Sequence, residues 1–175
     1  MTSPINLSGR VAIVTGAGGG LGRAHALLLA SRGAQVIVND LGDAADAVVA
    51  EIRAAGGQAR AAKCSVADAE AVQAMVVAVL AEFGRIDILI NNAGILRDKS
   101  FAKMDLADFR LVLDVHVMGA AHCTHAVWNT MRAQNYGRIV MTTSCSGLYG
   151  NFGQANYAAA KMALVGMMQT LGIKG

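Results

Sequence analysis

The stretch 11-VAIVTGAGGGLG-22 joins a short apolar run to a turn of closely spaced glycines. The run Val11–Thr15 predicts a buried strand, because it is short, β-branched and ends at a glycine. Gly16 and Gly20 can adopt positive φ and let a ligand approach the backbone closely. A helix predicted over Gly22–Ser31 would direct its free N–H groups and positive dipole end at the turn. This stretch therefore predicts a site for a pyrophosphate between a strand and a helix.

The glycine spacing limits which phosphate ligand this turn can hold. It reads G-x-x-x-G-x-G, whereas the commoner dinucleotide pattern is G-x-G-x-x-G. No Lys-Ser or Lys-Thr pair follows, so the turn is not a nucleoside-triphosphate loop. A tight turn that binds nothing remains the alternative interpretation.

Outside this stretch, apolar runs and helical segments keep alternating to the end of the chain. Further strands are predicted over residues 35–39, 59–63, 86–90 and 138–143, helices over 44–55, 68–83, 105–134 and 157–171, and a turn at 91–94. Strands joined by helices run parallel, and right-handed crossovers place helices on both faces. We therefore predict an α/β doubly wound parallel sheet, Rossmann-like, with three α/β/α layers in a single domain over residues 1–175.

Composition excludes several other classes of protein. The 175 residues are 54% hydrophobic and 15% charged, which argues against disorder. The formal net charge is +3, but the basic residues are scattered, so nucleic acid is not expected as a partner. No apolar stretch reaches the roughly 18 residues of a membrane span. Three cysteines without C-x-x-C spacing predict reduced thiols in a cytoplasmic protein.

Asp40 stands at the end of the second predicted strand, where a carboxylate can accept hydrogen bonds from both ribose hydroxyls of an adenosine. The same charge would repel a 2′-phosphate, and residues 17–19 contain no Arg or Lys to offset it. The expected cofactor is therefore NAD rather than NADP. The alternative is a solvated Asp that caps the next segment.

Tyr157 and Lys161 are four residues apart on a predicted helix and therefore share one face. An ammonium one turn away would stabilise a phenolate, which suits the tyrosine to acid/base work on an alcohol or ketone. Ser144 follows the fifth predicted strand, where its hydroxyl could bind the reacting oxygen. Alone, such a Tyr/Lys pair is usually a surface contact; the glycine turn, Asp40 and Ser144 make it specific.

Taken together, these motifs resemble the short-chain dehydrogenase/reductase family. The matching elements, in the family's order, are Thr15–Gly22, the sequence NNAG at 91–94, Ser144 and Y-x-x-x-K at 157–161. Within the family, NNAGILRDKSF at 91–101 and SGLYGNFGQANYAAAK at 146–161 are similar to the (3R)-hydroxyacyl-CoA dehydrogenase parts of peroxisomal multifunctional enzymes. The resemblance implies an NAD-dependent oxidoreductase of lipid metabolism that moves a hydride between nicotinamide and a secondary alcohol or ketone.

The same resemblance implies roles for individual residues. Ser144, Tyr157 and Lys161 would be catalytic, with Lys161 also on the nicotinamide ribose. The residues expected to contact the cofactor are Gly16, Gly20, Leu21, Gly22, Asp40, Ser65, Val66, Asn91, Ala93, Gly94, Tyr157 and Lys161. No metal site is expected, because His122, Cys123 and His125 would need further ligands.

The sequence departs from the family at two of these places. Ser65 stands where the family often has Asp, so backbone groups would take a larger part in adenine recognition. His116 stands where many members have an Asn that holds a water beside the active-site lysine. The resemblance does not say whether this imidazole joins the proton relay.

The motifs are compatible with several functions. The best candidate substrate is a 3-hydroxyacyl-CoA; a steroid or 3-oxoacyl carrier-protein reductase is the alternative within the class. Family members usually continue with two more strands, so we expect a C-terminally incomplete domain whose activity is uncertain, and a non-catalytic dinucleotide-binding module is a third possibility. Apolar faces on the helices over 105–134 and 157–171 resemble the family's dimer surface and predict a homo-oligomer.

Overall fold

Five parallel strands form one sheet in the order β3-β2-β1-β4-β5 in the computed structural model, which describes residues 5–173. The strands are β1 (Val11–Thr15), β2 (Gln35–Asp40), β3 (Gln58–Lys63), β4 (Ile88–Asn91) and β5 (Arg138–Met141). Every strand pair is parallel, as the alternation of strands and helices predicts.

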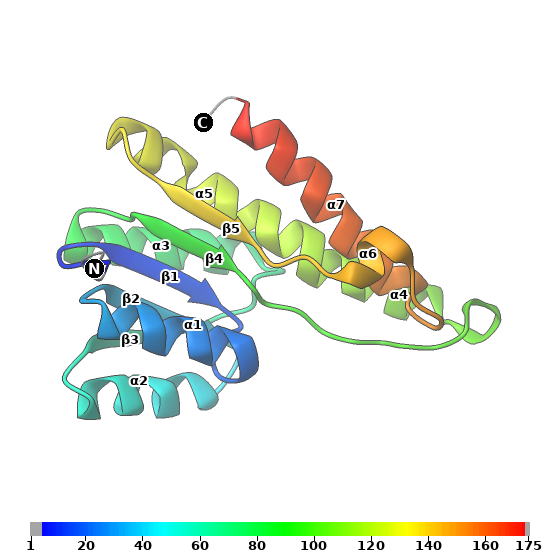
Figure 1. The fold of residues 1–175 in the computed structure, drawn as a ribbon, viewed down its shortest axis with the longest axis horizontal. Helices are drawn as coiled ribbons and strands as arrows, with labels where there is room; N and C mark the ends of the chain where they lie inside the picture. The colour runs from blue at the N-terminus through cyan, green and yellow to red at the C-terminus, as the bar shows by residue number, and fades with distance from the viewer. Residues whose placement is uncertain (1–4, 174–175) are drawn as a thin grey trace.

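Helices connect the strands and cover both faces of the sheet (Figure 1). They are α1 (Gly20–Ser31), α2 (Ala44–Ala54), α3 (Ala69–Phe83), α4 (Leu106–Leu113), α5 (Gly119–Ala133), α6 (Cys145–Tyr149) and α7 (Ala155–Gly172). A short 3₁₀ helix, η1 (Phe101–Lys103), precedes α4, and a π-helical segment, η2 (Asp114–Met118), joins α4 to α5. The predicted Rossmann-like three-layer fold is confirmed; the single-domain boundaries stay a prediction.

Two apolar cores lie on opposite sides of the sheet, because successive strand residues point to opposite faces. Val14 and Val36 pack with α1 and α2 around Ile52. Ile13 and Leu89 face the other way and pack with α3 and α5 around Val127. Burial on both sides explains why the strands are continuous apolar runs rather than alternating ones.

The strand order reverses beside β1, which lies between β2 and β4. In such sheets the crevice for a ligand opens at the carboxyl ends of the two strands on either side of the reversal. Figure 1 shows these ends pointing toward α4 and α6, with the long connection after β4 running past them. The fold therefore places the glycine turn and the residues after β4 and β5 at one edge.

Element boundaries differ from the predicted ones by a few residues. Helix α1 begins at Gly20 instead of Gly22, β4 begins at Ile88, and β5 ends at Met141. Asn91, predicted to open a turn, is the last residue of β4, and residues 92–100 form an irregular connection. The bounds of β4 and β5 follow from their pairing with neighbouring strands, which local sequence does not encode.

Two features of the helices were not predicted. The long helical stretch over 105–134 is capped by Asp105, as expected, but η2 interrupts it. Helix α6 was missed because it has only five residues, among them a glycine. Both features lie at the carboxyl edge of the sheet, next to the predicted catalytic residues.

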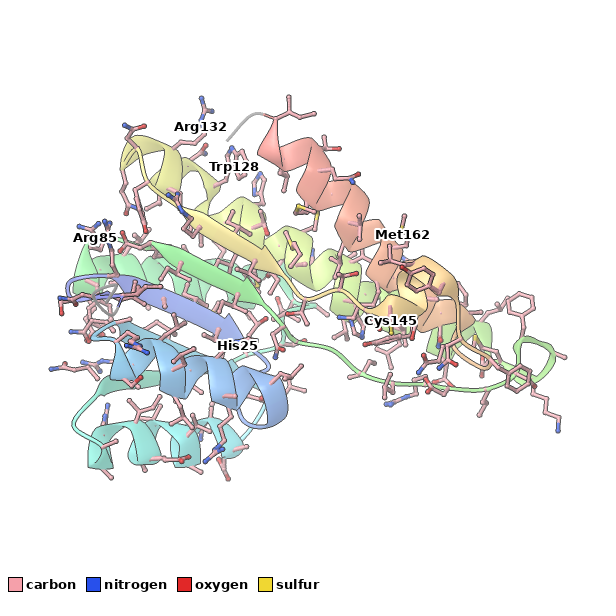
Figure 2. All side chains as sticks on the ribbon, viewed as in Figure 1. His25, Arg85, Trp128, Arg132, Cys145 and Met162 are labelled. Carbon is pink, nitrogen blue, oxygen red and sulfur yellow. The ribbon has the colours of Figure 1, made fainter. Side chains whose placement is uncertain are left out.

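One sizeable cavity lies away from that edge. It has a volume of about 620 Å³ and lies beside β5, between α5 and α7. Figure 2 labels Trp128 and Arg132 of α5 on its rim. Within residues 5–173 no helix has the length and apolar character to cross a membrane.

Candidate active site

The glycine turn has the backbone that the sequence predicts. Gly16 and Gly20 have φ of 61° and 51°, a region in which side chains are disfavoured. A Cβ added to Gly22 would lie 2.2 Å from the Gly16 carbonyl oxygen, so only glycine fits there. A Cβ on Gly19 or Gly20 would meet nothing within 4 Å, so the space in front of α1 is open.

The N-terminus of α1 offers free hydrogen-bond donors to a ligand. Gly19, the residue before the helix, has no side chain to cap it, and the first turn of α1 contains no acidic residue. The first N–H groups of a helix need external acceptors, and the dipole favours a negative charge there. The turn therefore fits the pyrophosphate of a dinucleotide. Leu21, in the same turn, is exposed.

Two residues outside the predicted set hold the turn in place. Thr15 Oγ1 accepts hydrogen bonds from the backbone N–H groups of Asn92 and Ala93, both at 3.0 Å. The Asn92 amide donates to the carbonyls of Thr15 (2.9 Å) and Gly16 (3.1 Å). Thr15 belongs to the glycine motif and Asn92 to the NNAG motif, but only the pairing of β1 with β4 shows that they bond to each other.

Asp40 ends β2 beside the glycine turn. Its carboxylate accepts hydrogen bonds from the backbone N–H of Gly18 (2.8 Å) and of Leu41 (2.7 Å). A Cβ on Gly18 would lie 2.8 Å from Asp40 Oδ2, so glycine there lets the turn close on the carboxylate. This contact fixes a negative charge beside the open turn, as the prediction for an adenosine ribose requires.

Tyr157 and Lys161 share one face of α7, as predicted. Lys161 Nζ lies 5.4 Å from the centre of the Tyr157 ring. The Lys161 side chain is buried and donates a 2.6 Å hydrogen bond to the Thr142 carbonyl after β5. Burial disfavours the charged ammonium and lowers the pKa of Lys161 to about 8. A buried lysine whose ammonium bonds to one carbonyl and, within residues 5–173, to no carboxylate is typical of a functional group rather than a surface contact.

Ser144 lies in the segment between β5 and α7, where it caps the N-terminus of α6. Its Oγ accepts a 3.2 Å hydrogen bond from the Ser146 N–H. The neighbouring Thr143 Oγ1 donates to the Lys161 carbonyl at 2.9 Å. The Thr143 bond ties the segment to α7, and the fold brings all three predicted catalytic residues to one edge of the sheet.

The remaining predicted cofactor residues follow β3 and β4. Asn91 is buried at the end of β4, and its amide donates to Thr124 Oγ1 at 3.0 Å. Ala93 and Gly94 come next in the irregular connection, beside the glycine turn. Ser65 and Val66 follow β3, where Ser65 Oγ accepts from the Ala67 N–H at 3.2 Å. The cofactor roles of these residues stay predictions.

His116 occupies η2 and is buried within this group. Its ring lies edge-on to Tyr157, with centroids 5.3 Å apart and planes at 90°. Its Nε2 lies 3.0 Å from the Ile95 nitrogen and 2.9 Å from the Ile95 oxygen. Burial lowers the pKa of His116, and the nearby Lys161 charge acts in the same direction despite the contact with Ile95.

His122 and Cys123 of α5 have structural surroundings, whereas His125 is exposed. His122 Nδ1 lies 3.0 Å from the Val66 carbonyl oxygen. Cys123 is buried, and burial raises the pKa of its thiol to about 12. Across residues 5–173 no group of three or more His, Cys, Asp or Glu side chains is arranged to hold a metal.

The fold and this edge define a class: a doubly wound α/β protein with a dinucleotide turn and a Ser/Tyr/Lys set. A family model described as short chain dehydrogenase matches residues 10–174. The chain belongs to the short-chain dehydrogenase/reductase family, as the motifs predicted, and so to a family of nicotinamide-dependent dehydrogenases and reductases.

Individual relatives narrow the comparison. The chain is 54% identical to peroxisomal multifunctional enzyme type 2 of Mus musculus, over 100% of this chain and 25% of the relative. It is 47% identical to the 3-oxoacyl-[acyl-carrier-protein] reductase of a Synechocystis species, over 94% and 68%. The solved full-length peroxisomal multifunctional enzyme type 2 from Drosophila melanogaster superposes with a TM-score of 0.83 at 52% identity, covering 97% and 29%. The chain thus spans 20% to 40% of the length of the peroxisomal enzymes that it matches.

Proposed function

We propose that the protein is an NAD-dependent oxidoreductase that interconverts a secondary alcohol and a ketone, with a 3-hydroxyacyl-CoA as its substrate. The observation that carries the proposal is the buried Lys161 ammonium one turn from Tyr157, at the edge where the glycine turn opens. A lysine buried without a carboxylate partner does not stabilise the fold, because desolvation disfavours its charge. Stabilising a phenolate gives it a role.

In this proposal the chain's own residues handle the proton and the substrate oxygen. Tyr157 gives or takes the proton of the reacting oxygen. Lys161 stabilises the phenolate, and its hydrogen bond to Thr142 holds it in reach. Ser144 orients the same oxygen from the opposite segment. The nicotinamide, when bound, supplies or accepts the hydride.

Asp40 supports NAD rather than NADP as the cofactor. Its carboxylate is fixed by the Gly18 and Leu41 N–H groups and would lie beside a 2′-phosphate, with residues 17–19 uncharged. Titration with both cofactors is expected to show tighter binding of NAD in wild type, and a smaller preference in Asp40→Ser. Tighter binding of NADP to wild type would contradict the assignment.

Apolar side chains near the site support an acyl substrate. Leu148, Tyr149 and Phe152 are exposed on α6 and on the link to α7, and Phe152 is 90% exposed. These residues lie between Ser144 and Tyr157 in the chain. A hydrocarbon tail could cover this surface once the oxygen at C3 meets the catalytic pair.

Substitution of Tyr157 tests the proposed chemistry. In Tyr157→Phe, the loss of the hydroxyl should lower kcat by at least about 10²-fold, because no other group replaces the acid/base. Binding of NAD should stay near the wild-type level. The assay is NADH formation with a panel of 3-hydroxyacyl-CoAs and hydroxysteroids.

Tyr136→Phe is the matched control, because Tyr136 precedes β5 at the edge of the sheet opposite Tyr157, where its ring centre lies 3.8 Å from the Arg10 guanidinium, and it has the same hydroxyl. It should turn over like wild type. If wild type binds NAD but oxidises no member of the panel, and Tyr157→Phe changes nothing, the protein is a non-catalytic dinucleotide-binding module.

A second candidate, 3-oxoacyl carrier-protein reductase, is supported by the Synechocystis relative of that name. Both candidates have the reacting oxygen at C3 of an acyl thioester and differ in the carrier. A comparison of kcat/KM for the same acyl group on CoA and on acyl carrier protein separates them. A preference for the CoA thioester is the expected result.

We also propose a homo-oligomer that buries α5 and α7. Met162 and Met168 on α7 are 48% and 46% exposed, so α7 presents apolar side chains to solvent. Sedimentation of wild type should show a dimer or larger species. Met168→Glu should shift it toward the monomer, whereas a monomeric wild type would contradict the proposal.

A further inference from the structure

Two buried polar atoms near the site lack a hydrogen-bond partner. Among residues 5–173, Asn91 Oδ1 and His116 Nδ1 are the buried side-chain atoms left unpaired. The two residues are 5% and 3% exposed. Buried polar groups without a partner are rare and costly, so each needs an explanation. The proposed chemistry uses neither atom.

Both residues line the same small cavity at the carboxyl ends of β1 and β4. Its volume is about 10 Å³, which is close to the least that one water molecule needs. Val66, Val115 and Leu164 form much of the remaining wall. A single water there would meet the two unpaired atoms, whereas Thr15 Oγ1, also in the wall, is already bonded to the backbone of Ile90, Asn92 and Ala93.

We infer that this cavity holds an ordered water that joins His116 Nδ1 to Asn91 Oδ1 and fixes the imidazole as a positioning residue for Tyr157. The inference rests on the proposed function for its catalytic part only. The water site itself follows from the two unpaired atoms and the cavity between the strands and η2.

The contacts at the other nitrogen decide which tautomer this network uses. Nε2 faces both the N–H and the carbonyl of Ile95, and a neutral ring can pair with one of them at a time. An unpaired backbone N–H is rarer than an unpaired carbonyl. Nε2 therefore accepts from the Ile95 N–H, and Nδ1 carries the proton. Nδ1 then donates to the water, which donates to Asn91 Oδ1.

The imidazole so held connects two parts of the site. On one side its edge packs against the Tyr157 ring. On the other it leaves no room for a side chain at Gly94, where a Cβ would lie 2.3 Å from His116 Cε1. Rotation of the ring would therefore disturb both the connection after β4 and the tyrosine.

The charged and titratable groups that face the ring are Lys161 and Tyr157. The Lys161 charge opposes protonation of His116, so the ring stays neutral when the lysine is charged. The hydrogen-bond network therefore requires a neutral His116 ring in one tautomer. The ring does not gain or lose a proton in this role.

A spectroscopic measurement tests the water and the tautomer directly. A long-range ¹H–¹⁵N correlation spectrum of the wild-type protein at pH 7 should show His116 protonated at Nδ1 and unprotonated at Nε2. A high-resolution crystal structure should show one water within hydrogen-bond distance of His116 Nδ1 and Asn91 Oδ1. A proton on Nε2, or an empty cavity, would overturn the inference.

Variants test whether the ring positions Tyr157. His116→Leu should lower kcat by about 10- to 100-fold and raise the dissociation constant for NAD much less, because a misplaced acid/base affects the chemical step. His116→Gln, whose amide can still reach Ile95, should recover part of the loss. Met118→Leu, at an exposed position of the same η2 segment, is the matched control and should behave as wild type.

The outcomes separate this inference from the proposed function. If wild type turns over and His116→Leu has the same kcat, the positioning role is wrong. If wild type has no turnover on any substrate, the proposed function fails, while the spectrum and the crystal structure still decide the water and the tautomer.

Discussion

Lys161 shows at the scale of one residue how burial prepares a side chain for chemistry. The sequence places it four residues after Tyr157, but a solvated lysine at that spacing would be an ordinary surface contact. Packing of α7 against the segment after β5 removes the ammonium from water and leaves it the Thr142 carbonyl. Its pKa falls to about 8 for that reason.

The lowered pKa of Lys161 predicts how stability depends on pH. Between about 8 and the ordinary value of 10.5 the unfolded chain holds the proton more tightly than the folded one. Stability contributed by this residue therefore rises with pH across that window. Relative to Lys161→Met, the free energy of unfolding of cofactor-free wild type should increase by about 3 kcal/mol from pH 7 to pH 10.5.

Urea unfolding at several pH values measures this difference. Subtracting the value for Lys161→Met from the value for wild type at each pH removes the contributions of groups that both proteins share, such as Lys63. A difference that stays flat or falls over this range would show that Lys161 is solvated in the folded protein.

The sequence identified most single residues of the site by their chemistry. The i,i+4 spacing of Tyr157 and Lys161 indicates one helix face. Ser144 follows the strand that precedes this helix. Asn92 has no such signal of its own, because its role is a hydrogen bond to a carbonyl 77 positions earlier. The orphaned Nδ1 of His116 is also invisible without the neighbours that enclose it.

At the scale of elements, the helices show both what local pattern predicts and where it stops. The sequence predicts helices that begin at Asp68 and Asp105, and both residues are helix caps in the structure. Their carboxylates accept hydrogen bonds from the N–H groups of Ala71 (3.0 Å) and Ala107 (2.8 Å). The π-helical segment η2 was not predicted, because nothing local demands it. It places His116 against Ile95 and Tyr157, which are contacts across the fold.

Two glycines inside helices predict opposite effects of adding a methyl group. Gly22 in α1 is buried, and a Cβ there would lie 2.2 Å from the Gly16 carbonyl. Gly22→Ala should push the turn away from its place, abolish NAD binding and destabilise the protein by about 2 kcal/mol or more. Isothermal titration with NAD and urea unfolding measure the two effects.

Gly166→Ala in α7 is the matched control, because a Cβ there meets nothing within 4 Å. It should keep NAD binding and gain about 0.5–1 kcal/mol of stability, since glycine is a poor helix former. Equal NAD binding by both variants would mean that the turn does not hold the pyrophosphate.

At the scale of the whole molecule, one carboxylate links the two central strands, β1 and β4, at the edge of the sheet opposite the site. Asp87, before β4, is buried and accepts hydrogen bonds from Arg10 (2.7 Å), Arg85 and the Val11 N–H of β1 (2.9 Å). Burial alone would raise its pKa, but the bonds from Arg85, Val11 and Arg10 outweigh it and lower the pKa to about 2.

Asp87 therefore predicts a loss of stability in acid. A carboxyl with a lowered folded pKa contributes stability above its ordinary pKa of 3.8, and the contribution is lost as the pH falls toward 2. Asp87→Asn should lower the free energy of unfolding by about 2 kcal/mol at pH 7, because two guanidinium groups lose their partner. The difference from wild type should shrink between pH 4 and pH 2.

Asp114→Asn serves as the control for this experiment. Asp114 forms an exposed ion pair with Arg110 at 3.1 Å, so its loss should cost at most about 0.5 kcal/mol. If both substitutions cost the same at pH 7, the buried carboxylate does not hold β1 to β4.

The sequence by itself determined the alternation of strands and helices, the glycine turn, the acidic residue at the end of β2 and the Ser, Tyr and Lys of the candidate site. These follow from neighbours in the chain, because apolar periodicity, φ freedom and i,i+4 spacing are local properties. Only the tertiary structure decided the bonds of Thr15 to the connection after β4, the burial of Lys161 and the cavity beside His116. These depend on the sheet order β3-β2-β1-β4-β5, which brings distant segments together and sets which polar atoms water can reach.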